Sequence, residues 1–264
     1  MALRALAAQE ASWQALIDRF VRTTTPAECG YVAAWALDCG PHGEIAPTVL
    51  AAPSDIPARP LGKHEIFLWL GVPSADEASI AMATILLDTA ERTQANAFAH
   101  RADRASYVAA HAMARRLLGR VMGYAPDEIR LARDAYGKPY IRPVGSDAAP
   151  HVSISHGRGL VAVALGACPV GIDIEQLAQP LRLDAIAEHV LSPDAHARLL
   201  EVDAQARPAL FLRFWTLGEA FIKATGLGLA QDLRSFTFTP AGEPRLLHVD
   251  PRLGPAARWR FGII

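Results

Sequence analysis

The sequence predicts an α+β protein made of two lobes. Short strand-like runs and longer helical runs alternate along the chain, and they fall into two groups that meet near residues 166–170. The 264 residues are 51% hydrophobic and 20% charged, which provides enough apolar side chains for a core in each lobe. This composition excludes disordered and fibrous proteins.

The first lobe is expected over residues 63–167, after an N-terminal extension over residues 1–62. The extension holds a short helical pattern near residues 13–21 and then a run rich in Pro and Gly. The run EIFLWLGV at residues 65–72 has the length and the aromatic and β-branched content of a strand. The other elements expected here are a helical stretch to about residue 100, a helix over 103–118, and strands over 129–131, 139–141, 152–154 and 160–165.

The second lobe is expected over residues 168–264. It begins with a strand over residues 170–174, directly after Pro169. The strongest helical pattern of the chain covers residues 208–225 and ends at Gly226, a residue type that favours helix ends. The other expected elements are helices over 183–190 and 194–202 and a strand over 235–239.

Charge and cysteine content limit the partners and the compartment. With 26 basic and 27 acidic side chains the net charge is -1, so bulk charge gives no reason to expect a nucleic acid or a membrane as partner. No run approaches the roughly 20 apolar residues that span a bilayer, and the N-terminus lacks the apolar core of a signal peptide. The 3 cysteines contain no CxxC pair, which is typical of a reducing compartment. We therefore expect a cytoplasmic protein.

Two carboxylates share one face of the strand that opens the second lobe. Asp173 and Glu175 are two positions apart, so both point to the same side while Ile172 and Ile174 point to the other. Like charges on one face repel each other, and a hard divalent cation such as Mg²⁺ would relieve the repulsion. The alternative is a solvated strand end with two ordinary acids, and spacing alone favours it.

A glutamate and a lysine lie one turn apart on the helix over residues 208–225. Taken alone, Glu219 and Lys223 are an exposed helix pair worth about 0.2–0.5 kcal/mol. Large apolar side chains flank them, which instead favours a mostly buried helix whose charges need specific partners. Gly218 in the same helix costs about 1 kcal/mol relative to Ala. It indicates either the close approach of a backbone or ligand, or tolerated drift.

Three polar segments of the first lobe could hold phosphate groups. The turn SISHGRG at residues 153–159 combines hydroxyls, an imidazole and a guanidinium, although an ordinary turn explains it equally well. No GxSxG elbow is present, so a serine hydrolase is rejected. The run YGKP at 136–139 is good turn chemistry with one cation, and HRADR at 100–104 fits solvated surface charge.

Taken in order, these segments resemble the surfactin-synthetase-type (Sfp-type) 4'-phosphopantetheinyl transferases. The motifs are Phe98 with Asp103, YGKP at 136–139, VSISH at 152–156, VGIDIE at 170–175 and FWTLGEAFIK at 214–223. Each motif is weak alone, but the ordered set is specific, and it covers roughly residues 64–240. The resemblance implies a pseudo-twofold pair of similar α+β lobes, each a small, mainly antiparallel sheet packed on a long helix, with the active site in the cleft between them.

The resemblance also implies an activity. The 4'-phosphopantetheine arm of coenzyme A, the co-substrate, is transferred to a serine of an apo acyl, peptidyl or aryl carrier protein, and 3',5'-ADP is released. The reaction depends on Mg²⁺, with Mn²⁺ as the alternative metal. Because two fused lobes build the cleft within one chain, a monomer is expected.

Roles for individual residues follow from the same resemblance. Asp173, Glu175 and Glu219 resemble the family's metal ligands. Glu219 is also the expected general base for the serine proton, and Lys223 resembles the lysine near the reacting phosphate, so these two are the expected catalytic residues. The expected coenzyme-binding residues are Arg101, Lys138, Pro139, Ser155 and His156.

Three departures from the family pattern leave alternatives. Gly218 stands where the family usually has Lys, Ser153 stands where many members have Asn, and the chain stops at Ile264 where a final core strand is usual. A short-ended form is therefore expected. One alternative is a non-catalytic member that still binds coenzyme A or a carrier protein, and another is a metal-dependent phosphohydrolase that uses water as the nucleophile.

Overall fold

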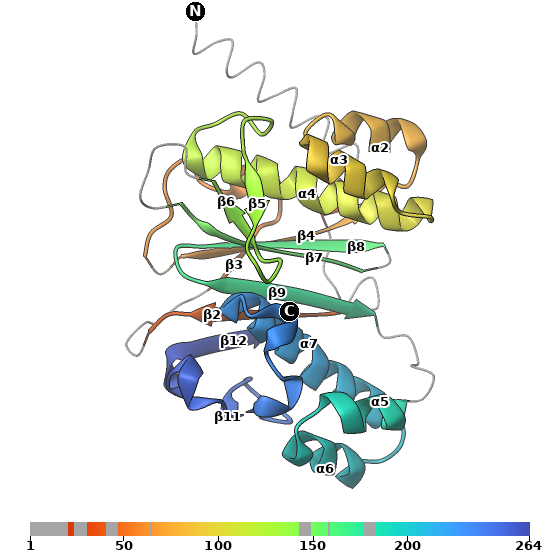
Figure 1. Ribbon diagram of the computed structural model, residues 1–264, viewed down its shortest axis with the longest axis vertical. Helices are drawn as coiled ribbons and strands as arrows, with labels where there is room; N and C mark the ends of the chain where they lie inside the picture. The colour runs from red at the N-terminus through yellow and green to blue at the C-terminus, as the bar shows by residue number, and fades with distance from the viewer. Residues whose placement is uncertain are drawn as a thin grey trace, which may run out of the picture.

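The structure is a computed structural model with α-helices and small β-sheets, so the predicted α+β class is confirmed (Figure 1). It describes residues 21–23, 31–40, 47–63, 65–142, 149–157, 159–176 and 183–264. The helical pattern expected near residues 13–21 lies outside the described residues, apart from Val21, which begins a strand.

The larger sheet has the strand order β1-β4-β8-β7, and β3 pairs parallel to β4. Its strands are β1 (Val21–Thr23), β3 (Thr48–Val49), β4 (Ile66–Pro73), β7 (His151–Gly157) and β8 (Leu160–Gly166). The strands predicted over 65–72, 152–154 and 160–165 are thus confirmed. Every residue of β8 is buried, because helices cover one face of the sheet and a second sheet covers the other.

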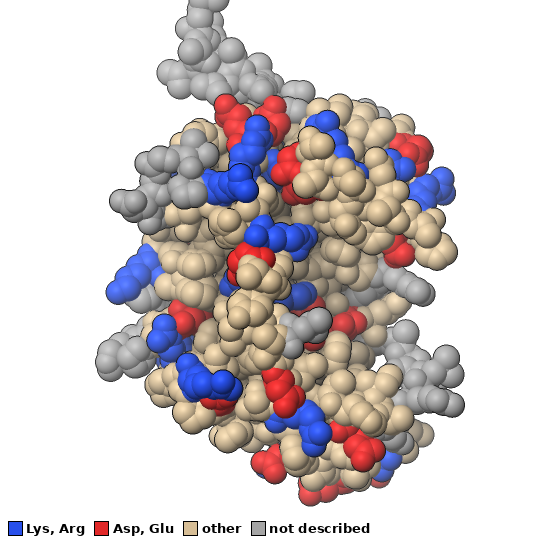
Figure 2. Space-filling view, viewed as in Figure 1, with Lys and Arg blue, Asp and Glu red and all other residues tan. Residues whose placement is uncertain are grey.

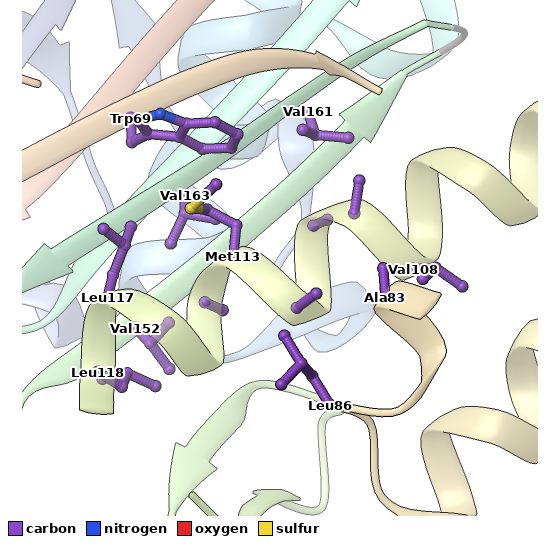
Figure 3. Packing of buried hydrophobic residues seen from close by; sticks show 14 of the residues in the cluster. Trp69, Ala83, Leu86, Val108, Met113, Leu117, Leu118, Val152, Val161 and Val163 are labelled. Atoms are coloured by element: carbon purple, nitrogen blue, oxygen red, sulfur yellow. The ribbon is translucent and has the colours of Figure 1, made fainter. Parts of the chain in front are cut away.

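The helix α4 (Arg101–Met122) packs along the outer face of this sheet. Figure 3 shows Met113 and Leu117 of α4 directed toward Trp69 of β4 and Val163 of β8. Packing of this kind explains why the apolar positions of the predicted helix recur every three or four residues.

The single helical stretch expected before residue 100 is instead two helices, α2 (Glu77–Thr84) and α3 (Thr89–Asn96). The break is caused by Asp88, whose side chain accepts a hydrogen bond from the backbone N–H of Glu91 at 3.0 Å. The Glu91 side chain in turn accepts from the backbone N–H of Asp88 at 3.0 Å. This reciprocal capping box starts a new helix.

A buried ion cluster joins α3 to α4. The Arg115 side chain is completely buried, and its guanidinium donates to Glu91 Oε2 and to Asp88 Oδ2, each at 2.8 Å. His111 Nδ1 lies 2.8 Å from Glu91 Oε1. Burial alone would raise the pKa of Glu91, but His111 and Arg115 outweigh it and hold this pKa at about 2.

The smaller sheet is antiparallel and has the order β12-β2-β9, with β2 (Tyr31–Asp38) between β9 (Val170–Gln176) and β12 (Trp259–Ile263). Residues 1–62, expected as an N-terminal extension, supply β2 at the centre of this sheet and β1 and β3 beside β4 in the larger one. Close to the end of the chain, β12 pairs along β2 and buries Trp259 and Phe261 in the core.

The helix α7 (Arg207–Thr225) covers the outer face of the smaller sheet, as the pattern over 208–225 predicted. The remaining helices and strands are β5 (Leu131–Arg133), β6 (Pro139–Ile141), α5 (Leu183–Val190), α6 (Pro193–Glu201), β10 (Thr237–Phe238) and β11 (Leu246–His248). Short 3₁₀ turns lie between α7 and β10 and between β11 and β12.

The main elements form four layers, in the order α4, larger sheet, smaller sheet, α7 (Figure 1). Between the sheets lies a core that includes Leu68 and Ala162 from the larger sheet and Trp35 and Ile172 from the smaller one. Gly171 brings β9 unusually close to α7, because a Cβ atom at this position would lie 1.9 Å from the carbonyl oxygen of Ala220. The glycine therefore fixes the distance between the strand and the helix that carry the predicted site.

Candidate active site

The predicted alternation along β9 is confirmed. Ile172 and Ile174 face the core between the sheets, and Asp173 and Glu175 lie on the opposite side of the strand, toward α7. Asp173 is buried and Glu175 is half-buried. The reading of these acids as a solvated strand end therefore does not hold for Asp173.

Asp173 is the centre of a small polar cluster that joins three elements. Its Oδ1 accepts hydrogen bonds from Lys223 Nζ of α7 at 2.6 Å and from Ser155 Oγ of β7 at 2.9 Å. Lys223 Nζ also donates to Ser155 Oγ at 3.0 Å. The other carboxylate oxygen, Oδ2, is buried and has no hydrogen-bond partner among the described residues.

The two neighbouring glutamates are electrostatically coupled to Asp173. Burial and the charge of Asp173 raise the pKa of Glu175, although its Oε1 accepts a hydrogen bond from Trp215 Nε1 at 2.8 Å. Burial and the same charge also raise the pKa of Glu219. The carboxylates of Glu175 and Glu219 thus lie in an environment whose negative charge and burial disfavour their ionised forms.

Asp173, Glu175 and Glu219 are the residues expected to hold a metal ion. In the described part of the chain, no group of three or more His, Cys, Asp or Glu side chains is arranged as a metal site, and Lys223 compensates the charge of Asp173. The chemistry of the donors nevertheless suits a hard cation, because carboxylate oxygens are its preferred ligands. The partnerless Oδ2 of Asp173 also requires a positive group or a donor.

The turn between β5 and β6 reaches from the larger sheet to α7. Asp134 Oδ1 accepts from the backbone N–H groups of Tyr136 and Lys138, each at 2.9 Å, and Gly137 takes the left-handed conformation with φ of 87°. Lys138 Nζ donates to the carbonyl oxygen of Ala224 at 2.7 Å, in the last turn of α7. Burial lowers the pKa of Lys138 to about 8, and Asp134 opposes that shift.

Ser155 and His156 point to opposite faces of β7. Ser155 contacts Asp173, whereas the His156 ring lies edge-on to Phe98 and Tyr107, with centroid distances of 6.5 and 5.9 Å. Loss of water around the ring lowers the pKa of His156 to about 4, and nearby charges add to the effect. Because the imidazole is turned away from the hydroxyl, the two residues form no hydrolase dyad.

A cavity of about 470 Å³ lies between this turn and α7, a volume typical of small-molecule sites. Four of the expected catalytic, metal-binding and coenzyme-binding residues line it together, namely Lys138, Pro139, Glu219 and Lys223. Arg101, Ser155, His156, Asp173 and Glu175 are not among the lining residues. Arg101 lies exposed in the first turn of α4.

Arg133 and His189 are among the lining residues of this cavity that sequence reasoning missed. Arg133 ends β5 and pairs with Pro139 across the hairpin, so the hairpin register could have placed it beside the turn. His189 comes from α5, and its Nδ1 donates to the carbonyl oxygen of Ala185 at 2.7 Å. An isolated histidine on an amphipathic helix gives no comparable signal.

Gly218 of α7 faces an aromatic side chain. A Cβ atom built there would lie 3.2 Å from the Phe236 ring and 3.6 Å from Leu233 Cδ2. The close neighbours of Gly218 are therefore side chains, and not the backbone or ligand that the sequence analysis considered. Ser153, at the position where many relatives of the expected family have Asn, accepts a hydrogen bond from the backbone N–H of Ile172 at 3.0 Å and so connects β7 to β9.

Charges on the surface around the site are mixed. Figure 2 shows basic and acidic side chains side by side across this face, and neither sign gathers into one broad patch among the described residues coloured there. Within the described residues, no helix has both the length and the apolar content needed to cross a membrane.

Two family models match adjoining parts of the chain. Residues 72–167 match the N-terminal model of 4'-phosphopantetheinyl transferase, and residues 169–263 match the 4'-phosphopantetheinyl transferase superfamily. The contact between β9 and α7 described above lies within the second match.

Individual relatives agree with these matches. A 4'-phosphopantetheinyl transferase of Bacillus subtilis is 31% identical over 164 residues, which are 62% of this chain and 70% of that protein. The 4'-phosphopantetheinyl transferase Sfp of Bacillus subtilis strain 168 is 33% identical, over 56% of this chain and 63% of that protein. The transferase psf-1 of Bacillus pumilus is 40% identical over 42% of this chain, and the aligned part spans about half of that relative, 46%. The chain therefore belongs to the 4'-phosphopantetheinyl transferase superfamily, and within it to the Sfp type that the ordered motifs predicted.

Proposed function

We propose that this enzyme transfers the 4'-phosphopantetheine arm of coenzyme A to a serine hydroxyl of an apo carrier protein, and that the cavity beside α7 is where the coenzyme binds. The products are the holo carrier protein and 3',5'-ADP. The observation that carries the proposal is the contact of Lys223 and Ser155 with Asp173, next to a cavity lined by Glu219 and Lys138.

We propose further that the two halves are pseudo-twofold lobes, divided near residues 167–168, with β2 added to the second lobe. This is supported by the layer order, because each sheet carries one long helix on its outer face. One chain then supplies both walls of the cavity, which supports a monomer. The proposed location of the protein is the cytoplasm, because free thiols such as those of Cys39 and Cys168 stay reduced there.

Coenzyme binding is assigned first to the turn between β5 and β6. Lys138 lines the cavity while its ammonium donates to the carbonyl oxygen of Ala224, and Pro139 forms part of the cavity wall. An ammonium beside a phosphate gives a charge-assisted hydrogen bond, which is stronger than a neutral one. Ser155, His156 and Arg101 are further proposed contacts of the coenzyme phosphates, on the strength of the family motifs.

The proposed metal is Mg²⁺, with Mn²⁺ as the alternative, and Asp173, Glu175 and Glu219 would hold it. When bound, the cation supplies positive charge for the acids and for the pyrophosphate oxygens of the coenzyme. The partnerless Oδ2 of Asp173 and the raised pKa of both glutamates support a cation here. Trp215 orients Glu175 through its indole N–H.

The catalytic roles are assigned to the two residues of α7 that line the cavity. Glu219 has a raised pKa, so it is a stronger base than an ordinary carboxylate and accepts the proton of the attacking serine. Lys223 holds a positive charge against the negative charge that develops on the transferred phosphoryl group. Asp173 and Ser155 position the Lys223 ammonium through bonds of 2.6 and 3.0 Å.

The test is the intact mass of an apo carrier protein incubated with this enzyme, coenzyme A and Mg²⁺. The expected result is a gain of one phosphopantetheine, about 340 Da, which EDTA abolishes. No gain with several carrier types, while coenzyme A still binds in calorimetry, would support the non-catalytic alternative. Release of phosphopantetheine without a carrier would support the phosphohydrolase.

A further inference from the structure

Two cysteines outside the site lie opposite each other at one end of the smaller sheet. Cys39 directly follows β2, and Cys168 lies two residues before β9. The two strands are antiparallel, and the last pair in their ladder is Leu37 with Val170. Two residues further along in this register, Cys39 is opposite Cys168.

Hydrogen bonds show that the register continues to this point. The backbone N–H of Asp38 donates to the carbonyl oxygen of Pro169 at 2.9 Å, so these two residues form a bonded pair. The N–H of Cys39 points the other way and donates to Arg258 at 3.1 Å. The cysteines therefore occupy a non-hydrogen-bonded pair, where Cα atoms lie about 4.5 Å apart, within the range that disulfides span.

The side chains of both cysteines point to the same face. Alternate residues of β2 and β9, including Trp35 and Ile172, form the core between the sheets, and Cys39 and Cys168 continue that alternation. Both thiols pack against this core and both are only half-buried, so a small oxidant can reach them.

The two thiols are also close enough to affect each other. Burial raises the pKa of the Cys168 thiol, and the nearby Asp38 and Cys39 add to the shift. Each sulfur donates only weak hydrogen bonds to carbonyl oxygens, Cys39 Sγ to Arg258 at 3.3 Å and to Gly40 at 3.5 Å, and Cys168 Sγ to Lys63 at 3.5 Å. Such bonds are easily given up.

We propose that Cys39 and Cys168 are a redox-active pair that peroxides oxidise to an intramolecular disulfide. The first thiolate attacks a peroxide oxygen and becomes a sulfenic acid, and the displaced oxygen leaves as water after taking a proton. The second thiol attacks the sulfenic sulfur, forms the S–S bond and releases a second water. Two thiols and one hydrogen peroxide thus give one disulfide and two waters.

The crosslink has a definite structural effect. It ties the end of β2 to the segment between β8 and β9, where the chain passes from the larger sheet to the smaller one. The loop that it closes contains the whole larger sheet except β1. A crosslink across a long loop restricts the unfolded chain and therefore raises stability. The oxidised protein is thus the more stable form.

The experiment compares the full-length protein after treatment with hydrogen peroxide and after treatment with dithiothreitol. Non-reducing digestion and mass spectrometry should find a Cys39–Cys168 crosslinked peptide and an intact-mass loss of about 2 Da. The melting temperature should rise by several degrees on oxidation and return on reduction. Cys39→Ser and Cys168→Ser should abolish both changes, whereas Cys29→Ser, at a residue outside the described part of the chain, should keep them.

Three results would overturn the proposal. They are a bridge that contains Cys29, oxidation of either thiol beyond the sulfenic acid without a crosslink, and a crosslink that leaves the melting temperature unchanged. If a serine variant fails to fold, the wild-type protein is treated with hydrogen peroxide and then alkylated. Cys39 and Cys168 should then lose their reactivity toward the alkylating reagent together as the peroxide dose increases.

Discussion

Replacing Gly171 by alanine should damage both the stability and the site. The added Cβ would lie 1.9 Å from the carbonyl oxygen of Ala220 and 2.6 Å from the backbone nitrogen of Ala224. These are backbone atoms of α7, so no side-chain rotation can relieve the contact, and the helix must move away from β9 by more than 1 Å, roughly the shortfall from van der Waals contact. Overpacked cores typically lose about 1–3 kcal/mol. A clash with backbone atoms belongs at the top of that range or above it, so we expect Gly171→Ala to lower the free energy of unfolding by about 3 kcal/mol or more.

The assay is urea and thermal unfolding followed by circular dichroism, with the melting temperature expected to fall by about 6–12 °C for a chain of this size. The matched control is Gly218→Ala on the same helix, where the new Cβ meets the Phe236 ring at 3.2 Å. At this position the gain in helix propensity offsets the tight contact, so the free energy of unfolding should change by no more than about 1 kcal/mol. A loss below about 1 kcal/mol for Gly171→Ala would show that β9 and α7 are not held at the distance described.

Three further predictions concern charged groups. Asp173→Asn removes the charge that positions Lys223, so transfer to a carrier protein should fall at least about a hundredfold in the mass-shift assay, and an unchanged rate would remove Asp173 from the site. Burial lowers the pKa of Lys138 to about 8, so its ammonium is present below this pH and lost above it. In calorimetry, 3',5'-ADP should therefore bind about tenfold more weakly well above pH 8 than at pH 7. Lys138→Arg should remove this pH dependence, because arginine keeps its charge. Glu91→Gln leaves the completely buried Arg115 with Asp88 as its remaining carboxylate partner, so the free energy of unfolding should drop by about 1.5–3 kcal/mol in urea, and an unchanged value would contradict the buried cluster.

The elements that the sequence predicted well are those whose burial is set locally. The helix α7 was predicted from a long run rich in apolar residues that ends at Gly226, and the strand β9 from a short apolar run after Pro169 in which acids alternate with isoleucines. The alternation of Asp173 with Ile172 followed from the same period and placed the acid on the side of α7. Local periodicity was thus sufficient to place the two acids on one face of β9, but the resemblance to a family, and not the period, identified them as site residues.

What the sequence could not predict depends on contacts between distant segments. The run YVAAWALD of β2 is buried on both faces, so it has no alternation, and its place between β9 and β12 is set only by long-range pairing. Arg133 and His189 line the cavity because a hairpin and α5 meet beside α7. The break between α2 and α3 did have a local signal, because Asp88 is a capping residue three positions before Glu91. Periodicity alone did not reveal it.

The site depends on how closely the two sheets meet. Small side chains such as Ala162 and Ala164 of β8 face the smaller sheet, which lets the layers approach. At the edge of this contact two serines of β7 reach across: Ser153 accepts the backbone N–H of Ile172 at 3.0 Å, and Ser155 donates to Asp173 at 2.9 Å. These hydrogen bonds fix β7 against β9, just as Gly171 fixes β9 against α7. The position of the acid relative to the cavity is therefore determined by both sheets and by α7, so neither half of the chain can form the site alone.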